Sequence, residues 1–155
     1  MEHHEGPVAR SSVGARPDGV DDETVRALGK LSEALETVER ARGHLYSMHQ
    51  LIGRADFMLS DAADALEAAG HDGWARRVRE ELIGLNVLEG RWTYQVVEEF
   101  DDGYLSDFRA VERTAREELA DGVRHIYEAE LKEQRRTRGR PGHEAGPTAD
   151  NGSPP

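Results

Sequence analysis

A stripe of apolar positions extends through the first half of the chain. Counting from Leu28 in alternating steps of three and four residues gives a series of positions on one side of a helix. Every second position of this series is apolar: Leu31, Val38, Leu45, Ile52, Leu59 and Leu66. This spacing is typical of one face of a helix packed against other structure. We call these six residues and the three polar ones between them, Arg42, His49 and Asp56, the inner seam. The neighbouring column is small or apolar too, which predicts a wide buried face: Ala34, Ala41, Met48, Ala55, Ala62 and Ala69.

The pattern predicts a single helix from about residue 21 to Ala69. Asp21 or Asp22 can cap its first turn, and Gly70 can end it. Gly53 lies inside this range, where the sequence allows either a continuing helix or a turn. We predict one helix because the apolar register continues across Gly53.

Three shorter segments follow. Helices are predicted from Asp72 to about Asn86, over residues 91–100, and from Ser106 to Leu131, with Asp101–Gly103 as a break before the last one. Residues 91–100 also alternate as a strand does, but no other segment offers a strand partner. The prediction is an all-α fold, in which two long antiparallel helices are joined by two shorter ones in a four-helix assembly.

Composition limits the function classes. The 155 residues suit one helical bundle domain over 21–131, with disordered segments at 1–20 and 132–155. The net charge of -11 argues against general nucleic-acid binding, and the lack of cysteine excludes disulfides and thiolate metal sites. No apolar run approaches the roughly 18 residues that span a bilayer, so we expect no membrane insertion and a cytoplasmic protein.

The polar residues of the inner seam are the first candidate site. Arg42, His49 and Asp56 stand one heptad apart on a face that is otherwise apolar. Charged groups are costly to bury unless they are paired or coordinated. One interpretation is a structural layer, in which each residue finds an opposite charge on the facing helix and fixes the register.

The other interpretation is a metal site in the bundle core. His49 and Asp56 are the first predicted ligands, completed by Glu98 and His125, with Glu99 or Glu128 as further donors. Imidazole and carboxylate groups of this kind hold iron, manganese or zinc in helical bundles. Such a centre predicts hydrolytic or redox chemistry.

Aromatic residues form the second candidate site. Five of them fall in one short window: Trp92, Tyr94, Phe100, Tyr104 and Phe108. They predict packing between helices, a patch for a partner, or a small-molecule sensor pocket lined by Trp92 and Tyr94 with His49 as a polar contact.

The preferred functional prediction is a non-enzymatic helical interaction or scaffold module. Part of the apolar face of the long first helix is expected to stay uncovered, which predicts a homodimer or a helical protein partner. The predicted contact residues are Arg42, Leu45, Ile52, Leu59, Trp92, Tyr94 and Phe100. The metal site and the sensor pocket are the alternatives.

Overall fold

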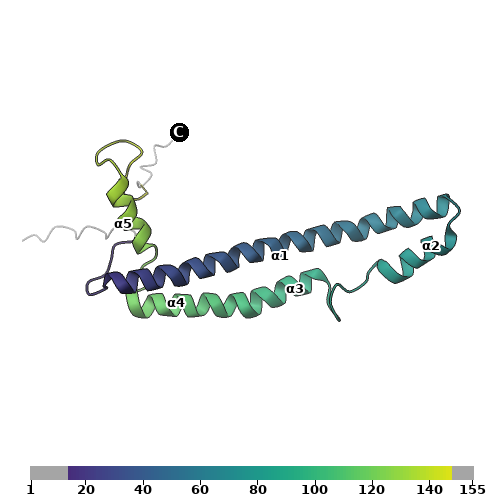
Figure 1. The fold of residues 1–155 in the computed structure, drawn as a ribbon, viewed down its shortest axis with the longest axis horizontal. Helices are drawn as coiled ribbons and strands as arrows, with labels where there is room; N and C mark the ends of the chain where they lie inside the picture. Colours follow the sequence, from purple (N-terminus) through teal and green to yellow (C-terminus); the bar gives the residue numbers. More distant parts are fainter. Residues whose placement is uncertain (1–13, 148–155) are drawn as a thin grey trace, which may run out of the picture. The chain divides into compact units, whose positions relative to one another are not determined.

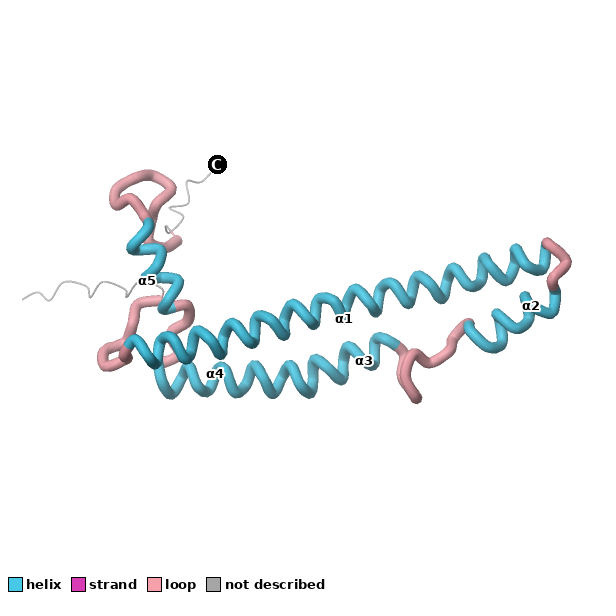
Figure 2. Tube along the Cα trace, viewed as in Figure 1, coloured by secondary structure: helices cyan, strands magenta, loops and turns pink. Residues whose placement is uncertain are grey.

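The computed structural model of the chain describes residues 14–147, and within this range it contains helices and no strand. The predicted all-α class is confirmed (Figures 1 and 2). The elements in chain order are α1 (Asp22–Ala68), α2 (Asp72–Arg77), η1 (Val78–Leu82), α3 (Thr93–Phe100), η2 (Asp101–Leu105), α4 (Ser106–Ala120) and α5 (Ile126–Arg135).

Helix α1 begins and ends as its sequence predicts. The Asp21 carboxylate accepts a hydrogen bond from the backbone N–H of Thr24 at 2.7 Å, which caps the first turn. Gly70 follows the last turn with φ +82°, a left-handed conformation that glycine adopts without strain. Gly53 lies within the continuous helix, so no turn interrupts α1 there.

The second predicted helix is shorter than expected. It consists of α2 and the π-helical turn η1, and it ends at Leu82 rather than near Asn86. Gly84 has φ +78°, outside the helical region, and its backbone N–H donates to the Asp56 carboxylate at 2.9 Å. The chain therefore leaves the helix where a side chain of α1 accepts the amide.

The predicted break at Asp101–Gly103 is wrong. Residues 101–105 form the π-helical turn η2, so the helical backbone continues from α3 through η2 into α4. Leu105, which ends the turn, is fully buried, and Asp101 pairs with Arg42 of α1. Glycine within a helix is less stable than alanine by roughly 1 kcal/mol. The burial of the Leu105 side chain is large enough to offset this cost for Gly103.

The last helix also differs from the prediction, which continued it to Leu131. It ends at Ala120, because Asp121 (φ +50°) and Gly122 (φ +74°) turn the backbone into the left-handed region. A separate helix, α5, continues to Arg135, beyond the predicted start of the disordered tail at residue 132. The outer parts of the predicted disordered ends, residues 1–13 and 148–155, lie outside the described residues.

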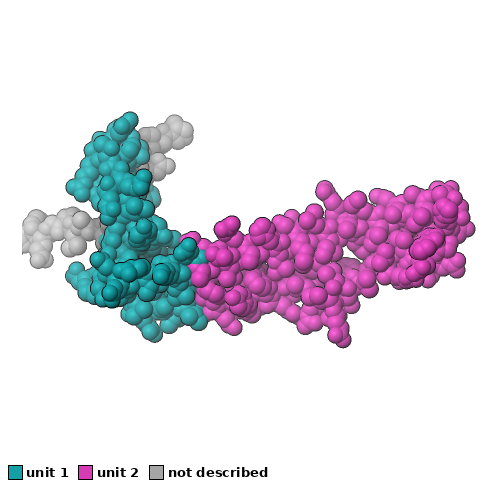
Figure 3. Space-filling model, in the orientation of Figure 1, with its two compact units in different colours: residues 1–33, 111–155 teal, residues 34–110 magenta. Residues whose placement is uncertain are grey.

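The chain forms two compact units, coloured separately in Figure 3. Unit 1 combines Met1–Glu33 with Val111–Pro155, and unit 2 is Ala34–Ala110. In unit 1, the buried residues Val25, Ala120 and Ile126 form a small core. In unit 2, the buried residues are Ala63, Ala75, Thr93, Val97 and Leu105.

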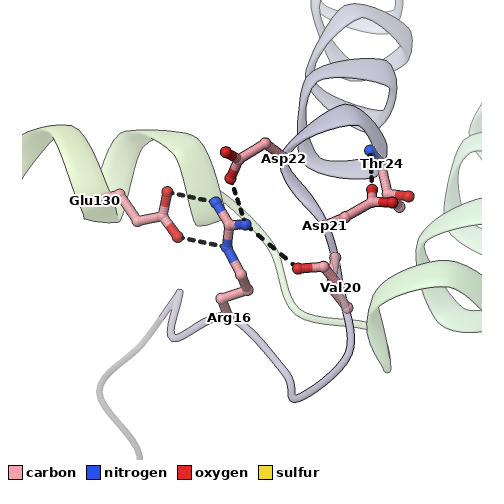
Figure 4. A network of polar contacts seen from close by, with 6 residues as sticks. All are labelled: Arg16, Val20, Asp21, Asp22, Thr24 and Glu130. Carbon is pink, nitrogen blue, oxygen red and sulfur yellow. Dashed lines mark hydrogen bonds and ion pairs between the residues drawn. The ribbon is translucent and has the colours of Figure 1, made fainter.

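In unit 1, Arg16 links the segment before α1 to α5. Its guanidinium donates to both carboxylate oxygens of Glu130 at 2.7 and 2.9 Å, and to Asp22 and the Val20 carbonyl (Figure 4). The hydrogen bonds that Arg16 donates to Glu130, and then the one that it donates to Asp22, raise the pKa of Arg16. Residues 14–20, predicted to be disordered, thus include a defined polar contact.

A second ion pair in unit 1 is more enclosed. Glu112 is only 8% exposed, and both of its carboxylate oxygens accept hydrogen bonds from Arg116 at 3.2 Å. The Ser32 hydroxyl of α1 also donates to Glu112, at 3.0 Å. Arg116 in turn donates to the Gly122 carbonyl, so the pair connects α1, α4 and the turn after α4.

Candidate interaction surface of unit 2

The inner seam faces other elements of the fold, as the sequence predicts. Along α1, its apolar residues from Leu31 to Leu66 are all half-buried. Within unit 2, each of the three polar residues of the inner seam has a partner outside α1, and the partners follow one another in the reverse chain direction. In unit 2, this order of contacts places α1 antiparallel to the segment from Gly84 to Asp101.

Arg42 pairs with Asp101 in the most extensive of these contacts. The guanidinium donates to both carboxylate oxygens, at 3.0 and 2.8 Å, and lies 5.0 Å from the centroid of the Tyr46 ring. The hydrogen bonds from Arg42 lower the pKa of Asp101, while partial burial opposes this effect. Two parallel N–H···O bonds fix the position of Arg42 along η2 more strictly than a single contact does.

His49 and Asp56 have neutral partners instead of the predicted opposite charges. The Nδ1 atom of His49 lies 2.7 Å from the buried hydroxyl of Thr93, the first residue of α3. Asp56 accepts the N–H of Gly84, which has no side chain that a sequence pattern could reveal. Each of the three residues thus contacts another element of unit 2, and of the three only Arg42 does so through a charge pair.

The predicted metal ligands are not brought together. Over residues 14–147, no group of three or more His, Asp and Glu side chains is placed to hold a metal ion, so His49, Asp56, Glu98 and His125 form no such group. Glu98 is exposed on α3, and His125 belongs to unit 1, where it precedes α5 with its Nδ1 atom 3.9 Å from Glu128. The observations supply no geometry for an iron, manganese or zinc centre.

The predicted aromatic patch divides into two parts. Phe100, Tyr104 and Phe108 follow one another along one helical face, with ring centroids 5.8 and 6.0 Å apart in tilted and edge-to-face contacts. Trp92 instead donates its indole N–H to the Gly84 carbonyl at 3.2 Å, and Tyr94 is 49% exposed. The aromatic window therefore does not form a single surface.

A pocket of about 300 Å³ lies beside Trp92, close to where the sensor prediction placed one. Asp56 and Thr93 in its lining already hydrogen-bond to Gly84 and His49, and neither Tyr94 nor His49 lines it. The remaining lining is mainly apolar: Ile52, Gly53, Phe57, Leu85, Val87 and Trp92.

The column next to the inner seam is exposed, which contradicts the predicted wide buried face. Apart from the half-buried Met48, its members from Ala34 to Ala69 are exposed. Interleaved with this column are Leu51 and Met58, which are 63% and 61% exposed. We call the resulting surface the outer stripe, defined as His44, Met48, Leu51, Ala55, Met58, Ala62, Ala65 and Ala69.

Exposed apolar residues are concentrated in unit 2. Among the described residues, unit 1 has four large apolar side chains that are exposed: Val111, Leu119, Tyr127 and Leu131. Unit 2 has a larger set: Tyr46, Leu51, Phe57, Met58, Trp74, Leu82, Leu85, Val87, Leu88, Trp92, Tyr94 and Tyr104. Exposed apolar residues mark an interaction site where they form a contiguous surface, as along the outer stripe.

Comparisons with protein-family models, with curated proteins and with solved structures found no match. In the range 14–147, none of the helices combines the length and the apolar character that crossing a membrane requires. The interpretation of function therefore depends on the surfaces of the chain itself.

Proposed function

We propose that this protein is a non-enzymatic helical interaction module that self-associates through α1. The observation that supports the proposal is the outer stripe, because it leaves leucine and methionine in water along a helix whose other face is already packed. Burying a leucine or methionine side chain stabilises by about 1.5–3 kcal/mol, so a partner that covers this stripe gains free energy at several positions.

The pocket beside Trp92 favours this proposal over a sensor function. Its polar side chains are engaged in contacts within unit 2, which leaves mainly apolar lining for a ligand. Ligand sites in proteins usually add a few well-placed polar groups to such a lining. Apolar lining that extends to Phe57, which is 79% exposed, suits a surface for another chain.

Sedimentation equilibrium over a range of concentrations tests self-association. We expect the full chain to form a defined oligomer, and the double variant Leu51→Glu/Met58→Glu to raise the dissociation constant more than a hundredfold, because each glutamate forces a charge into an apolar contact. The control for one of these two added charges is Ser60→Glu, at an exposed position of α1 outside the outer stripe. A chain that stays monomeric at every concentration contradicts the proposal.

A further inference from the structure

The outer stripe has the repeat of a coiled coil. Its members follow one another in alternating steps of four and three residues from His44 to Ala69, a length of about 39 Å. The pattern covers more than three heptads, which is the range in which such repeats pair helices. The stripe is centred about 100° around α1 from the inner seam, so a partner on the stripe leaves the seam contacts in place.

We infer that the outer stripes of two copies pack against each other antiparallel, in the register that places Ala55 of each copy opposite Met58 of the other. This inference rests on the proposed self-association and specifies its geometry. The partner that covers the stripe is a second copy of this chain. When a copy of the stripe is reversed and laid against the original, both the side-chain sizes and the charges are complementary.

Residue sizes favour this register. In this antiparallel register, each layer of the interface joins one residue of the first copy to one residue of the second, and the two residue numbers sum to 113. Every layer then combines one larger and one small side chain, the alternation that fills a helix interface without voids. The layers are His44 with Ala69, Met48 with Ala65, Leu51 with Ala62, and Ala55 with Met58, each occurring twice. A parallel pair in register would instead put leucine against leucine and alanine against alanine.

Charges select the same register. Arg54 and Asp61 flank the outer stripe on one side, one heptad apart, and neither side chain has an ion pair or hydrogen bond within the described part of the chain. In the inferred pair, Arg54 of each copy lies beside Asp61 of the other, because residues that flank the layers on this side meet where their numbers sum to 115. This arrangement gives two symmetric ion pairs. A shift of one heptad in either direction brings Arg54 opposite Arg54 or Asp61 opposite Asp61, and like charges at such positions disfavour the pairing.

Cysteine cross-linking tests the arrangement directly, because the natural chain has no cysteine. In the full chain, the double variant Leu51→Cys/Ala62→Cys is expected to give a disulfide-linked dimer under mild oxidation. Each single variant is expected to stay uncross-linked, because equal residues of the two copies are offset by 11 positions, about 16 Å, well beyond the roughly 7 Å limit between disulfide-bonded Cα atoms. Both positions are exposed, so the substitutions leave the packed side of α1 unchanged.

A charge exchange provides the second measurement, by sedimentation at about 0.15 M salt. Arg54→Asp creates two repulsive pairs and is expected to raise the dissociation constant of the dimer about tenfold. The double variant Arg54→Asp/Asp61→Arg is expected to restore the original dissociation constant. Arg26→Asp, the same charge change on an exposed part of α1 in unit 1, is the control.

The outcomes separate the inference from the proposed function. A dimer that cross-links through Leu51→Cys alone, or whose affinity the charge exchange does not restore, overturns the antiparallel register while self-association stands. A wild-type chain that is monomeric at every concentration overturns the proposed function and the inference with it. Cross-linking confined to the double cysteine variant, together with restoration by the charge exchange, supports the inferred register.

Discussion

Replacing Arg116 by methionine removes one partner of the enclosed ion pair in unit 1. In the native structure, the side chains of Glu112 and Arg116 are 11% and 16% exposed, and both carboxylate oxygens accept hydrogen bonds from the guanidinium. The variant leaves Glu112 with the Ser32 hydroxyl as its remaining hydrogen-bond donor, and it also removes the bond to the Gly122 carbonyl. The aliphatic part of the arginine is approximately retained by methionine.

The expected loss of unfolding free energy is about 2–3 kcal/mol at pH 7, measured by urea denaturation with far-ultraviolet circular dichroism. Breaking a buried pair on one side typically costs about 3–5 kcal/mol, and we expect less because part of Glu112 remains in contact with water and with Ser32. Faster hydrogen exchange at the Gly122 amide, which is bonded to the Arg116 carbonyl, is the local counterpart of this loss.

The loss should depend on pH in a definite direction. In the native protein, the hydrogen bonds from Arg116 hold the pKa of Glu112 below its usual range against the effect of burial. A carboxylate with a lowered folded-state pKa stabilises the fold above its unfolded pKa, and this contribution disappears as the pH falls through the folded value. Without Arg116, burial destabilises the charged form of Glu112, so protonation of Glu112 removes part of the destabilisation of the variant. The difference between the two proteins is therefore largest at pH 7 and smaller near pH 4.

Two further variants make this prediction refutable. Arg113→Met, at an exposed position of the same helix, is expected to change the stability little. Glu112→Leu/Arg116→Met replaces the pair by apolar side chains and is expected to recover most of the loss, as such replacements often do. If Arg116→Met is no more destabilising than Arg113→Met, or if its effect is independent of pH, the enclosed pair does not stabilise unit 1.

Two other predictions concern unit 2. Leu105→Ala is expected to lower the free energy of unfolding in urea by about 2–5 kcal/mol, because Leu105 is fully buried. The control is Leu119→Ala, at a site that is 53% exposed, where we expect a smaller loss. Equal losses in the two variants would contradict the packing of η2. Asp101→Asn is expected to destabilise the protein at neutral pH. The difference from wild type should vanish as the pH falls through the lowered pKa of Asp101, because residue 101 is then uncharged in both proteins. A difference that persists at low pH would show that Asp101 acts mainly through packing.

The apolar repeat predicted α1 well, because periodicity identifies the residues that share a helical face. It did not predict what covers each face. The inner seam is half-buried as expected, but the neighbouring column of alanines is exposed, since no segment of unit 2 packs over it. Small apolar residues suit either a buried face or a helix surface, so the sequence alone could not distinguish these outcomes.

The ends of the later helices were harder to predict for a different reason. Asp-Gly occurs both at 102–103 and at 121–122, yet the first pair lies within a π-helical turn and the second ends α4. At the first site the neighbouring Asp101 and Leu105 have partners that stabilise the helical path, whereas at the second site Arg116 hydrogen-bonds to the carbonyl of the left-handed Gly122. Tertiary contacts thus decide between two conformations that the same dipeptide allows.

The polar positions of the inner seam were visible in the sequence, but two of their partners were not. A hydroxyl at the start of α3 and a backbone N–H at Gly84 leave no pattern of charge or spacing that could identify them. These contacts nevertheless limit how α1 can associate. A partner helix on the inner seam would have to displace the contacts of Arg42, His49 and Asp56 and leave polar groups unsatisfied, at a cost of about 1–3 kcal/mol each. The outer stripe has His44 as its sole polar member, at one end, so it is the face of α1 that a second copy can cover without this penalty.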